Sequence, residues 1–173
     1  MSSHLKPPVN SKDHIAGAAS AGIELVEYGD YQCPHCGAAY PVIKDIQRKF
    51  GEQVRFVFRN FPLSDAHPFA FPAAVAAEAA ALQGKFWEMH DVIFENQRLL
   101  SDAGLFKMAS TAGLDLEQFR NDIQKNELAE KVDADFESGV RSGVNGTPSF
   151  FINGKKFDGR VEDLYEVLEE STG

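Results

Sequence analysis

The sequence has few cysteines, no basic cluster and no long apolar run. Only two of its 173 residues are cysteines, and a chain of this length with 43% hydrophobic residues needs no disulfide staples to bury a core. The formal net charge is −9 and the pI is about 5.0. Because no lysine or arginine cluster offsets this negative field, we expect neither nucleic acid nor a membrane as a partner. The composition favours one domain, with or without a large insertion.

The N-terminal residues also lack the marks of an export signal. Such a signal carries a basic start and about 7–15 consecutive apolar residues, whereas residues 15–19 form only a brief, weakly apolar run. If Met1 is the native start, we expect a cytoplasmic protein. If Met1 was added to a mature fragment, a periplasmic or other extracytoplasmic protein is the alternative, because catalytic dithiols occur in both kinds of compartment.

Both cysteines lie in the tetrapeptide Cys33-Pro34-His35-Cys36, between a strand-like run and a helix-like run. Two thiols at this spacing can close a small disulfide ring, and the first thiolate lies against unpaired backbone N–H groups of the helix start. Pro34 suits a first helical turn, which needs no N–H there. The backbone N–H of His35, or its ring when protonated, can donate to the Cys33 sulfur. The pattern predicts a redox-active dithiol in which Cys33 attacks and Cys36 resolves.

Two other roles of the cysteine pair remain as alternatives. Two cysteines at this spacing are half of a tetrahedral zinc site, and the chain has five histidines that could complete it. However, no His-x3–5-His pair exists, so we predict no metal. A purely structural disulfide is less favoured still, because so small a ring removes little chain entropy. The histidines are His4, His14, His35, His67 and His90.

The first part of the chain reads as a strand, a helix and a second strand. Residues 1–14 are polar and contain two adjacent prolines, which predicts a flexible N-terminal arm. After a strand at about 23–28, apolar residues at three-to-four-residue steps predict a helix at about 35–50. The run at 54–61 is rich in β-branched and aromatic residues and predicts a second strand. The βαβ unit is therefore expected to be parallel and right-handed.

The remainder is helical up to a closing hairpin. The helix patterns between residues 65 and 143 are too many for a single crossover and predict a helical insertion. Ser149–Ile152 and Lys155–Asp158 flank Asn153-Gly154, a strong hairpin signal, and an amphipathic helix closes the chain. The helices expected in the insertion lie at about 69–83, 85–97, 102–112, 116–125 and 128–143.

Three segments carry a specific resemblance: Glu27–Cys36, Gly84–Asp91 and Gly143–Gly154. They resemble the DsbA-like thiol:disulfide oxidoreductases of the single-domain bacterial type, and the likeness covers roughly residues 13–170. The resemblance implies an α/β thioredoxin fold, β-α-β … β-β-α, with the helical insertion between the second and third strands. The expected parts are a flexible arm at 1–14, a thioredoxin-like domain at 15–64 and 144–173, and the insertion at 65–143.

The resemblance gives Glu27 a role beside the cysteines. Glu27 lies six residues before Cys33 and matches the position of the buried acid in thioredoxin-like proteins. We interpret it as a buried proton acceptor for Cys36, because a carboxyl whose pKa is raised by desolvation suits that task. The alternative is a solvent-facing strand residue. Glu24 and Asp30 are expected to be exposed.

A substrate-binding edge is implied at the start of the third strand. The resemblance implies a cis peptide bond at Thr147-Pro148, opposite the cysteines, with Gly146 beside it. A cis bond leaves neighbouring backbone groups free to pair with an extended substrate. The alternative is an ordinary trans proline in a turn. Trp87 and His90 recur at helical spacing and are expected to be core residues rather than ligands.

We therefore interpret the chain as a thiol:disulfide oxidoreductase that exchanges a Cys33–Cys36 disulfide with protein or small-molecule thiols and disulfides and with a redox partner. It is expected to need no bound cofactor. The Pro-His pair resembles that of oxidising family members, so we expect a fairly oxidising couple. One alternative is a redox-sensing or chaperone-like binding module with little turnover. Another, a glutathione-using fold like the kappa-class transferases, is weakened because those proteins do not rely on a Cys-x-x-Cys pair.

Overall fold

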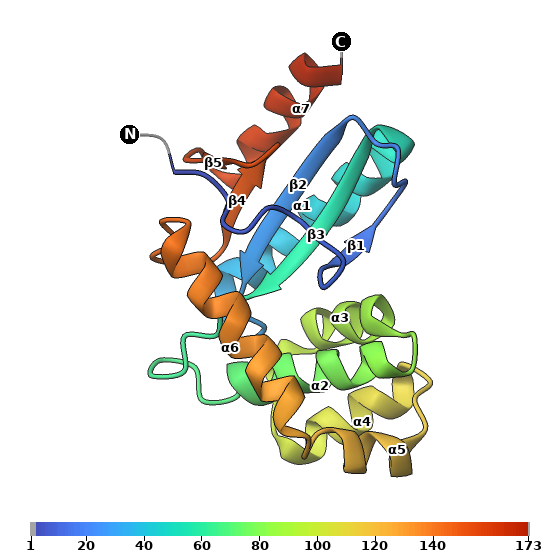
Figure 1. Ribbon diagram of the computed structural model, residues 1–173. Coiled ribbons are helices and arrows are strands. Elements are labelled where there is room, and N and C mark those ends of the chain that lie inside the picture. Colours follow the sequence, from blue (N-terminus) through green and yellow to red (C-terminus); the bar gives the residue numbers. More distant parts are fainter. Residues whose placement is uncertain (1–2, 173) are drawn as a thin grey trace.

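The computed structural model describes residues 3–172, which form a five-stranded sheet flanked by helices (Figure 1). Residues 1, 2 and 173, at the ends of the predicted arm and domain, lie outside the described residues. The strands are β1 (His14–Ala16), β2 (Ile23–Gly29), β3 (Val54–Asn60), β4 (Ser149–Ile152) and β5 (Lys155–Phe157). The helices are α1 (Pro34–Phe50), α2 (Ala70–Leu82), α3 (Phe86–Glu95), α4 (Asp102–Thr111), α5 (Leu116–Asp122), α6 (Asn126–Arg141) and α7 (Leu164–Thr172).

The sheet has the order β1-β3-β2-β4-β5. β2 and β3 are parallel and joined by α1, as the βαβ pattern predicts, while β1, β4 and β5 pair antiparallel with their neighbours. The thioredoxin fold is confirmed, and so is the helical insertion, which comprises α2–α6 between β3 and β4. The short edge strand β1 was not predicted. Its three residues, with Gly17 just after them, carry too little alternation to give a strand signal.

Both faces of the sheet are covered, so β2 is buried almost throughout. On one face, Leu25 and Phe56 pack with α1, α3 and α7 in the larger hydrophobic core. On the other face, Val26, Val57 and Phe151 form a smaller cluster beneath the N-terminal segment and α6. Because helices or the N-terminal segment cover each face, even Glu27 of β2 is buried. The carboxyl end of β2, where α1 begins, is therefore held rigidly.

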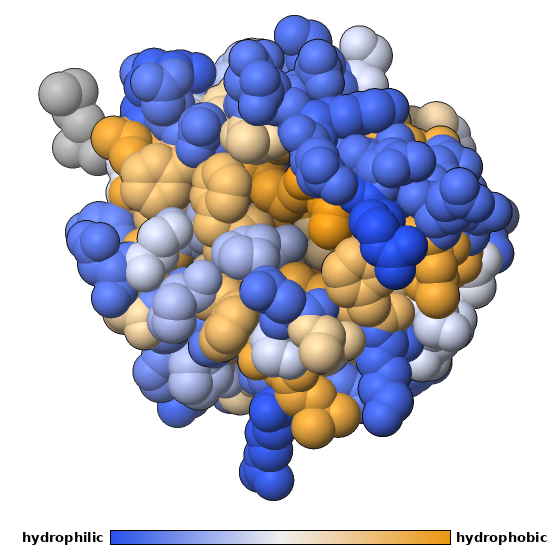
Figure 2. All heavy atoms as spheres, turned by 90° about the horizontal axis from the view of Figure 1, so that it is seen from below, coloured by the Kyte–Doolittle hydropathy of each residue, from blue (hydrophilic) through white to orange (hydrophobic). Residues whose placement is uncertain are grey.

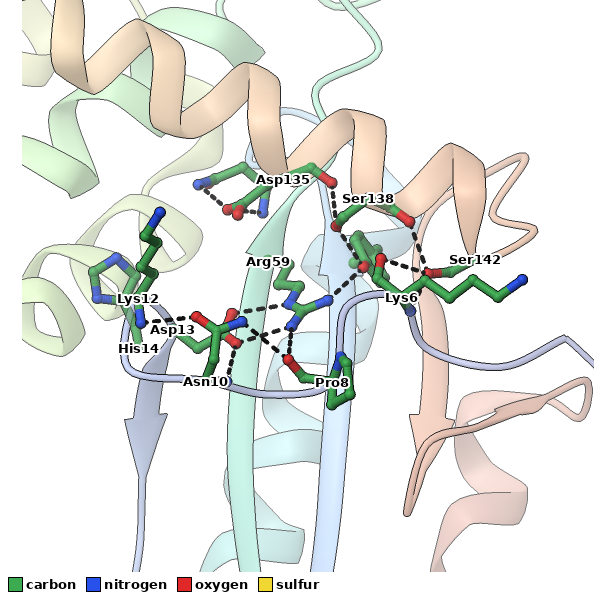
Figure 3. Close-up of polar contacts among 12 residues, drawn as sticks. Lys6, Pro8, Asn10, Lys12, Asp13, His14, Arg59, Asp135, Ser138 and Ser142 are labelled. Atoms are coloured by element: carbon green, nitrogen blue, oxygen red, sulfur yellow. Dashed lines mark hydrogen bonds and ion pairs between the residues drawn. The ribbon is translucent and has the colours of Figure 1, made fainter.

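The N-terminal segment, predicted to be a flexible arm, instead packs across the sheet (Figures 1 and 3). Leu5 is buried in the smaller cluster, and its N–H donates to Gly154 O at 2.8 Å. The guanidinium of Arg59 on β3 holds the segment through Asp13, with Nε–Oδ1 and Nη2–Oδ2 distances of 2.8 and 2.9 Å. Arg59 also donates to Tyr28 Oη at 2.9 Å and to Pro8 O at 3.3 Å. These partners lie far apart in sequence, so no local pattern could indicate them.

The insertion packs as a helical layer below the sheet (Figure 1). The alanine-rich α2 runs through its centre and is buried along most of its length, since small side chains let helices approach closely on several sides. The lower face of the molecule shows apolar side chains gathered in a hollow between hydrophilic ones (Figure 2). A cavity of about 580 Å³ lies between α2 and α4 and is lined among others by Phe71, Val75, Leu105 and Phe106.

Candidate functional site

The two cysteines lie at the start of α1, just after the loop that follows β2. Cys33 is the N-cap residue of α1, with extended backbone (φ −69°, ψ 123°), and Pro34 begins the helix as its spacing predicts. Both cysteines are free thiols and both are buried, Cys33 with 4% and Cys36 with 0% of its surface exposed. Only Cys33 has any reach toward solvent. The pair is therefore asymmetric, as an attacking and a resolving thiol must be.

The surroundings of Cys33 favour its thiolate. They lower its pKa to about 5, and the largest cause is the hydrogen bond from the Cys36 thiol. Burial opposes this shift, while hydrogen bonds from the backbone N–H groups of Cys36 and His35 act in the same direction as the Cys36 thiol. A thiol with this pKa is almost fully ionised at neutral pH, and the thiolate is the nucleophile in disulfide exchange.

Cys36 has the opposite electrostatics. Burial, the hydrogen bond to Cys33 and the negative charges of Glu27 and Cys33 raise its pKa well above the ordinary value. Its sulfur accepts a long hydrogen bond, 3.5 Å, from the backbone N–H of Asp30. Cys36 therefore stays protonated and needs a nearby base before it can attack.

Glu27 is buried, with 3% of its surface exposed, and it is close enough to both cysteines for their charges to interact. Its Oε2 is buried and finds no hydrogen-bond partner among residues 3–172. Burial, followed by the negative charge of Cys33, raises its pKa to about 8. Gly29 leaves room for the carboxyl group, because a Cβ at that position would lie 2.8 Å from Glu27 Oε2. Glu27 is thus a buried carboxyl that can gain or lose a proton near neutral pH.

Opposite Cys33 lies the start of β4. The Thr147–Pro148 bond is cis, as the family resemblance implies, and Cys33 Sγ lies 3.7 Å from the Thr147 carbonyl oxygen. A cavity of about 420 Å³ opens beside this bond, lined among others by His35, Thr147 and Pro148. Gly146 precedes the bond, and a Cβ there would have no neighbour within 4 Å.

His35 is close to Cys33 through its backbone. The His35 N–H contributes to lowering the Cys33 pKa. Its side chain is exposed on the rim of the cavity near Pro148. The His35 ring makes no hydrogen bond with any residue that the structure describes. The hydrogen bond from this ring to the Cys33 sulfur, which the sequence analysis offered as an alternative to that of the backbone N–H, is therefore not seen.

Asp30 is buried, with 1% of its surface exposed, which contradicts the expectation of an exposed side chain. Its Oδ1 accepts the N–H groups of Gln32 and Cys33 at 2.7 and 3.0 Å. Its Oδ2 accepts from the Leu63 N–H at 2.9 Å and lies 2.8 Å from His67 Nδ1. The carboxylate thus ties the loop before Cys33 to the loop after β3. An aspartate three residues before a helix-start cysteine is an Asx-turn signal that could have indicated this.

The aromatic residues of α3 form core, as expected. His90 has 4% of its surface exposed, its Nδ1 lies 2.9 Å from Tyr31 Oη, and burial lowers its pKa to about 3. Trp87 packs against Phe86 and Phe56. A second residue that the sequence analysis did not identify, Gln97 in the 3₁₀ turn η2 (Gln97–Leu99), reaches the cysteine loop from the insertion.

Within residues 3–172, no group of three or more His, Cys, Asp or Glu side chains is arranged to hold a metal ion. None of the helices in that range combines the length and the apolar character needed to cross a membrane.

In a comparison with protein families, the model of the thioredoxin family matches residues 9–170, nearly the whole chain. The chain is 41% identical to the Na(+)/H(+) antiporter NhaA 1 of Mycolicibacterium gilvum, over 98% of this chain and 28% of that protein. It is 42% identical to the Na(+)/H(+) antiporter NhaA 3 of Salinispora tropica, over 90% of this chain and 24% of that protein. The chain thus spans about a quarter of the length of these curated relatives.

Solved structures share the whole fold. Oxidised BdbD from Bacillus subtilis superposes with a TM-score of 0.85 at 24% identity, covering 100% of this chain and 98% of that one. A thioredoxin-like oxidoreductase from Silicibacter pomeroyi gives 0.82 at 25% identity, covering 94% of both chains. The thiol-disulfide exchange protein alpha-DsbA2 from Wolbachia pipientis gives 0.81 at 20% identity, covering 94% of this chain and 88% of that one.

Proposed function

Because the chain belongs to the thioredoxin family and has a DsbA-like fold, we propose that it is a thiol:disulfide oxidoreductase that exchanges a Cys33–Cys36 disulfide with protein or small-molecule thiols. The observation that carries the proposal is the opposed electrostatics of the two cysteines. The pKa of Cys33 is lowered to about 5, while that of Cys36 is raised well above its ordinary value. Disulfide exchange needs one thiolate that attacks or leaves readily and a second thiol held in reserve.

The oxidation of a dithiol substrate proceeds in two exchanges. A substrate thiolate attacks Cys33 Sγ of the Cys33–Cys36 disulfide, forming a mixed disulfide, and Cys36 leaves as a thiolate that takes a proton. The second substrate thiol, once deprotonated, attacks the substrate sulfur of the mixed disulfide and expels the Cys33 thiolate. The substrate loses two electrons and two protons, and the protein gains the two electrons. The reverse sequence reduces a substrate disulfide.

Within this proposal, Glu27 gives the proton to Cys36 or takes it away. The support is its burial beside the dithiol and its pKa of about 8. A carboxyl with that pKa is partly protonated at neutral pH, so it can serve in either direction of the exchange. Pro34 and His35 supply the first helical turn, whose N–H groups hold the Cys33 thiolate.

The substrate chain is proposed to lie along the cavity at Gly146, Thr147 and Pro148. The Thr147 carbonyl lies next to the Cys33 sulfur, so a backbone paired with this edge would bring its own sulfur to Cys33. The cavity of about 420 Å³ beside Pro148 can take side chains that flank a substrate cysteine. No bound cofactor is needed, because the dithiol itself carries the electrons.

The antiporter relatives do not change this proposal. The thioredoxin family model matches residues 9–170, so the part that those proteins share with this chain is itself thioredoxin-like. Their name describes proteins about four times as long, in which the shared fold is one part. We propose the dithiol exchange for that shared part.

The test is a pair of cysteine variants. Cys33→Ser is expected to abolish both insulin reduction and dithiol-peptide oxidation, because the attacking sulfur is gone. Cys36→Ser is expected to accumulate mixed disulfides that mass spectrometry detects, because no resolving thiol remains. Ultraviolet titration of the wild-type thiolate should give an apparent pKa near 5.

Two outcomes would contradict the proposal. Mixed disulfides trapped on Cys36 in the Cys33→Ser variant would reverse the roles. A normal thiolate titration with stoichiometric reaction but no turnover would favour the alternative, a redox-sensing or chaperone-like module.

A further inference from the structure

The side chain of Gln97 ends on the cysteine loop. Gln97 lies in the 3₁₀ turn between α3 and α4, 64 residues from Cys33 along the chain. Its Nε2 donates to the Tyr31 carbonyl at 2.8 Å and to the Cys33 carbonyl at 3.0 Å. One amide group of the insertion therefore binds the carbonyls of residues 31 and 33, in the loop that carries the reactive sulfur.

The first turn of α1 leaves room for this amide. Gly37 follows Cys36, and its N–H donates to the Cys33 carbonyl at 3.0 Å, the first hydrogen bond of the helix. A Cβ on Gly37 would overlap Gln97 Oε1 and lie 2.7 Å from Gln97 Cδ. Gly37 does not have the positive φ that favours glycine. Glycine is therefore needed at position 37 because it leaves space for Gln97, and not because of its backbone conformation.

The loop around Cys33, the N-cap residue of α1, is held from two sides. Asp30 holds the N–H groups of Gln32 and Cys33 from one side, and Gln97 holds carbonyls from the other. The peptide groups on both sides of Cys33 are thereby fixed in direction. The position of the Cys33 sulfur over the helix N–H groups depends on that direction.

We infer that Gln97 is a positioning residue for Cys33, which fixes residues 31–33 so that the sulfur stays against the N–H groups of His35 and Cys36. This inference adds a residue to the proposed function, and its relevance to catalysis depends on that function. Through Gln97, the helical insertion contributes to the reactivity of a dithiol that belongs to the thioredoxin-like part of the chain.

Loss of the Gln97 amide should weaken the hydrogen bonds to the thiolate. The pKa of Cys33 is then expected to rise by roughly half a unit to one unit, and the equilibrium constant with glutathione to move about three- to tenfold toward the reducing side. Gln97→Met keeps the length of the side chain but has no donor, so it tests the hydrogen bonds and not the packing. The control is Gln124→Ala, because Gln124 is an exposed glutamine of the insertion whose amide donates to Arg120 O, four residues earlier.

A double-mutant cycle with Gly37 sharpens the test. Gly37→Ala is expected to push the amide away and to raise the Cys33 pKa as Gln97→Ala does. In the Gln97→Ala background, Gly37→Ala should add little, because its Cβ no longer meets the amide. The readouts are ultraviolet titration of the thiolate and equilibration with glutathione, neither of which requires turnover.

The inference is overturned if Gln97→Met leaves both the pKa and the glutathione equilibrium at wild-type values, or if the Gly37 and Gln97 effects add in full. Should Gly37→Ala fail to fold, Gln97→Met alone decides. If the variants shift the Cys33 pKa and the glutathione equilibrium but the wild type shows no catalytic turnover, the proposed function is refuted and the positioning role of Gln97 is supported.

Discussion

Glu27 and Asp30 are both buried near the dithiol, yet they differ in what surrounds their oxygens. Asp30 accepts three backbone N–H groups and lies against the His67 ring, so its carboxylate is fully engaged in holding the loop. Glu27 Oε2 has no hydrogen-bond partner in the part of the chain that the structure describes. A carboxyl without hydrogen bonds in a buried site favours its neutral form, and its pKa of about 8 follows mainly from burial. At the scale of the residue, Asp30 is suited to structure and Glu27 to proton transfer.

Glu27→Gln is therefore expected to slow the resolving step, in which Cys36 must lose its proton, by roughly 10²-fold, while attack by the Cys33 thiolate changes much less. In the wild type, this step should accelerate with rising pH as the Glu27 carboxyl ionises. The inflection should fall somewhat below 8, because Cys33 carries no charge in the mixed disulfide and its charge is the smaller cause of the raised pKa. Stopped-flow measurement of the two half-reactions checks this. Equal slowing of both steps would argue against the assignment.

Sequence motifs were enough to identify the cysteines, Glu27 and the Thr147–Pro148 pair as candidate site residues. No motif identifies Gln97, because its contact with Cys33 forms only when the chain between them has folded. Asp30 lies between these cases. Its local Asx-turn pattern is visible in sequence, but its burial depends on Leu63 and His67 from another loop.

At the scale of the element, helices and central strands followed their local patterns, whereas the N-terminal segment did not. A run without apolar periodicity predicts a loose arm when only its own residues are considered. Here the segment is held by a buried ion pair, with the side chains of Arg59 and Asp13 only 2% and 4% exposed. Asp13 is paired with a residue 46 positions away in the sequence, and hydrophobic periodicity gives no sign of such a pair.

Asp13→Asn is expected to lower the free energy of unfolding by about 3 kcal/mol near neutral pH, because it leaves the buried Arg59 charge without its counter-ion. The pKa of Asp13 in the folded protein is lowered, with the hydrogen bonds from Arg59 and the Asn10 N–H outweighing burial. The stability from this carboxylate is thus present above the ordinary value of 3.8 and is lost as pH falls through the lower, folded value. Urea denaturation should show the wild type and the variant converging in acid.

Asp65→Asn is the matched control for this experiment. Asp65 is an exposed aspartate in the loop between β3 and α2, so the same chemical change there should alter stability by less than about 0.5 kcal/mol. A variant at Asp13 that is as stable as this control would show that the ion pair contributes nothing to holding the N-terminal segment.

At the scale of the whole molecule, the dithiol couples redox state to stability. Cys33 is charged in the reduced folded protein at neutral pH, and its pKa of about 5 lies far below its ordinary value of 9.0. The unfolded reduced chain regains the ordinary pKa, so the interactions that lower it stabilise the folded reduced form. In the oxidised form no thiolate exists and this contribution vanishes. The small ring closed by the disulfide constrains the unfolded chain only slightly.

The reduced protein is accordingly expected to gain stability relative to the oxidised protein as pH rises from about 5 to about 9. Because the pKa of Cys33 is lower in the folded than in the unfolded protein, its contribution to stability is complete above about pH 9 and absent below about pH 5. Subtracting the two redox forms cancels most other titrating groups, since carboxylates such as Asp13 are common to both. Part of the gain is offset because the Cys33 charge also raises the pKa of Glu27. Urea denaturation of both forms across this range gives the difference directly, and reduced Cys33→Ser should lack the rise. Parallel stability curves for the two redox forms would mean that the folded site does not stabilise the Cys33 thiolate.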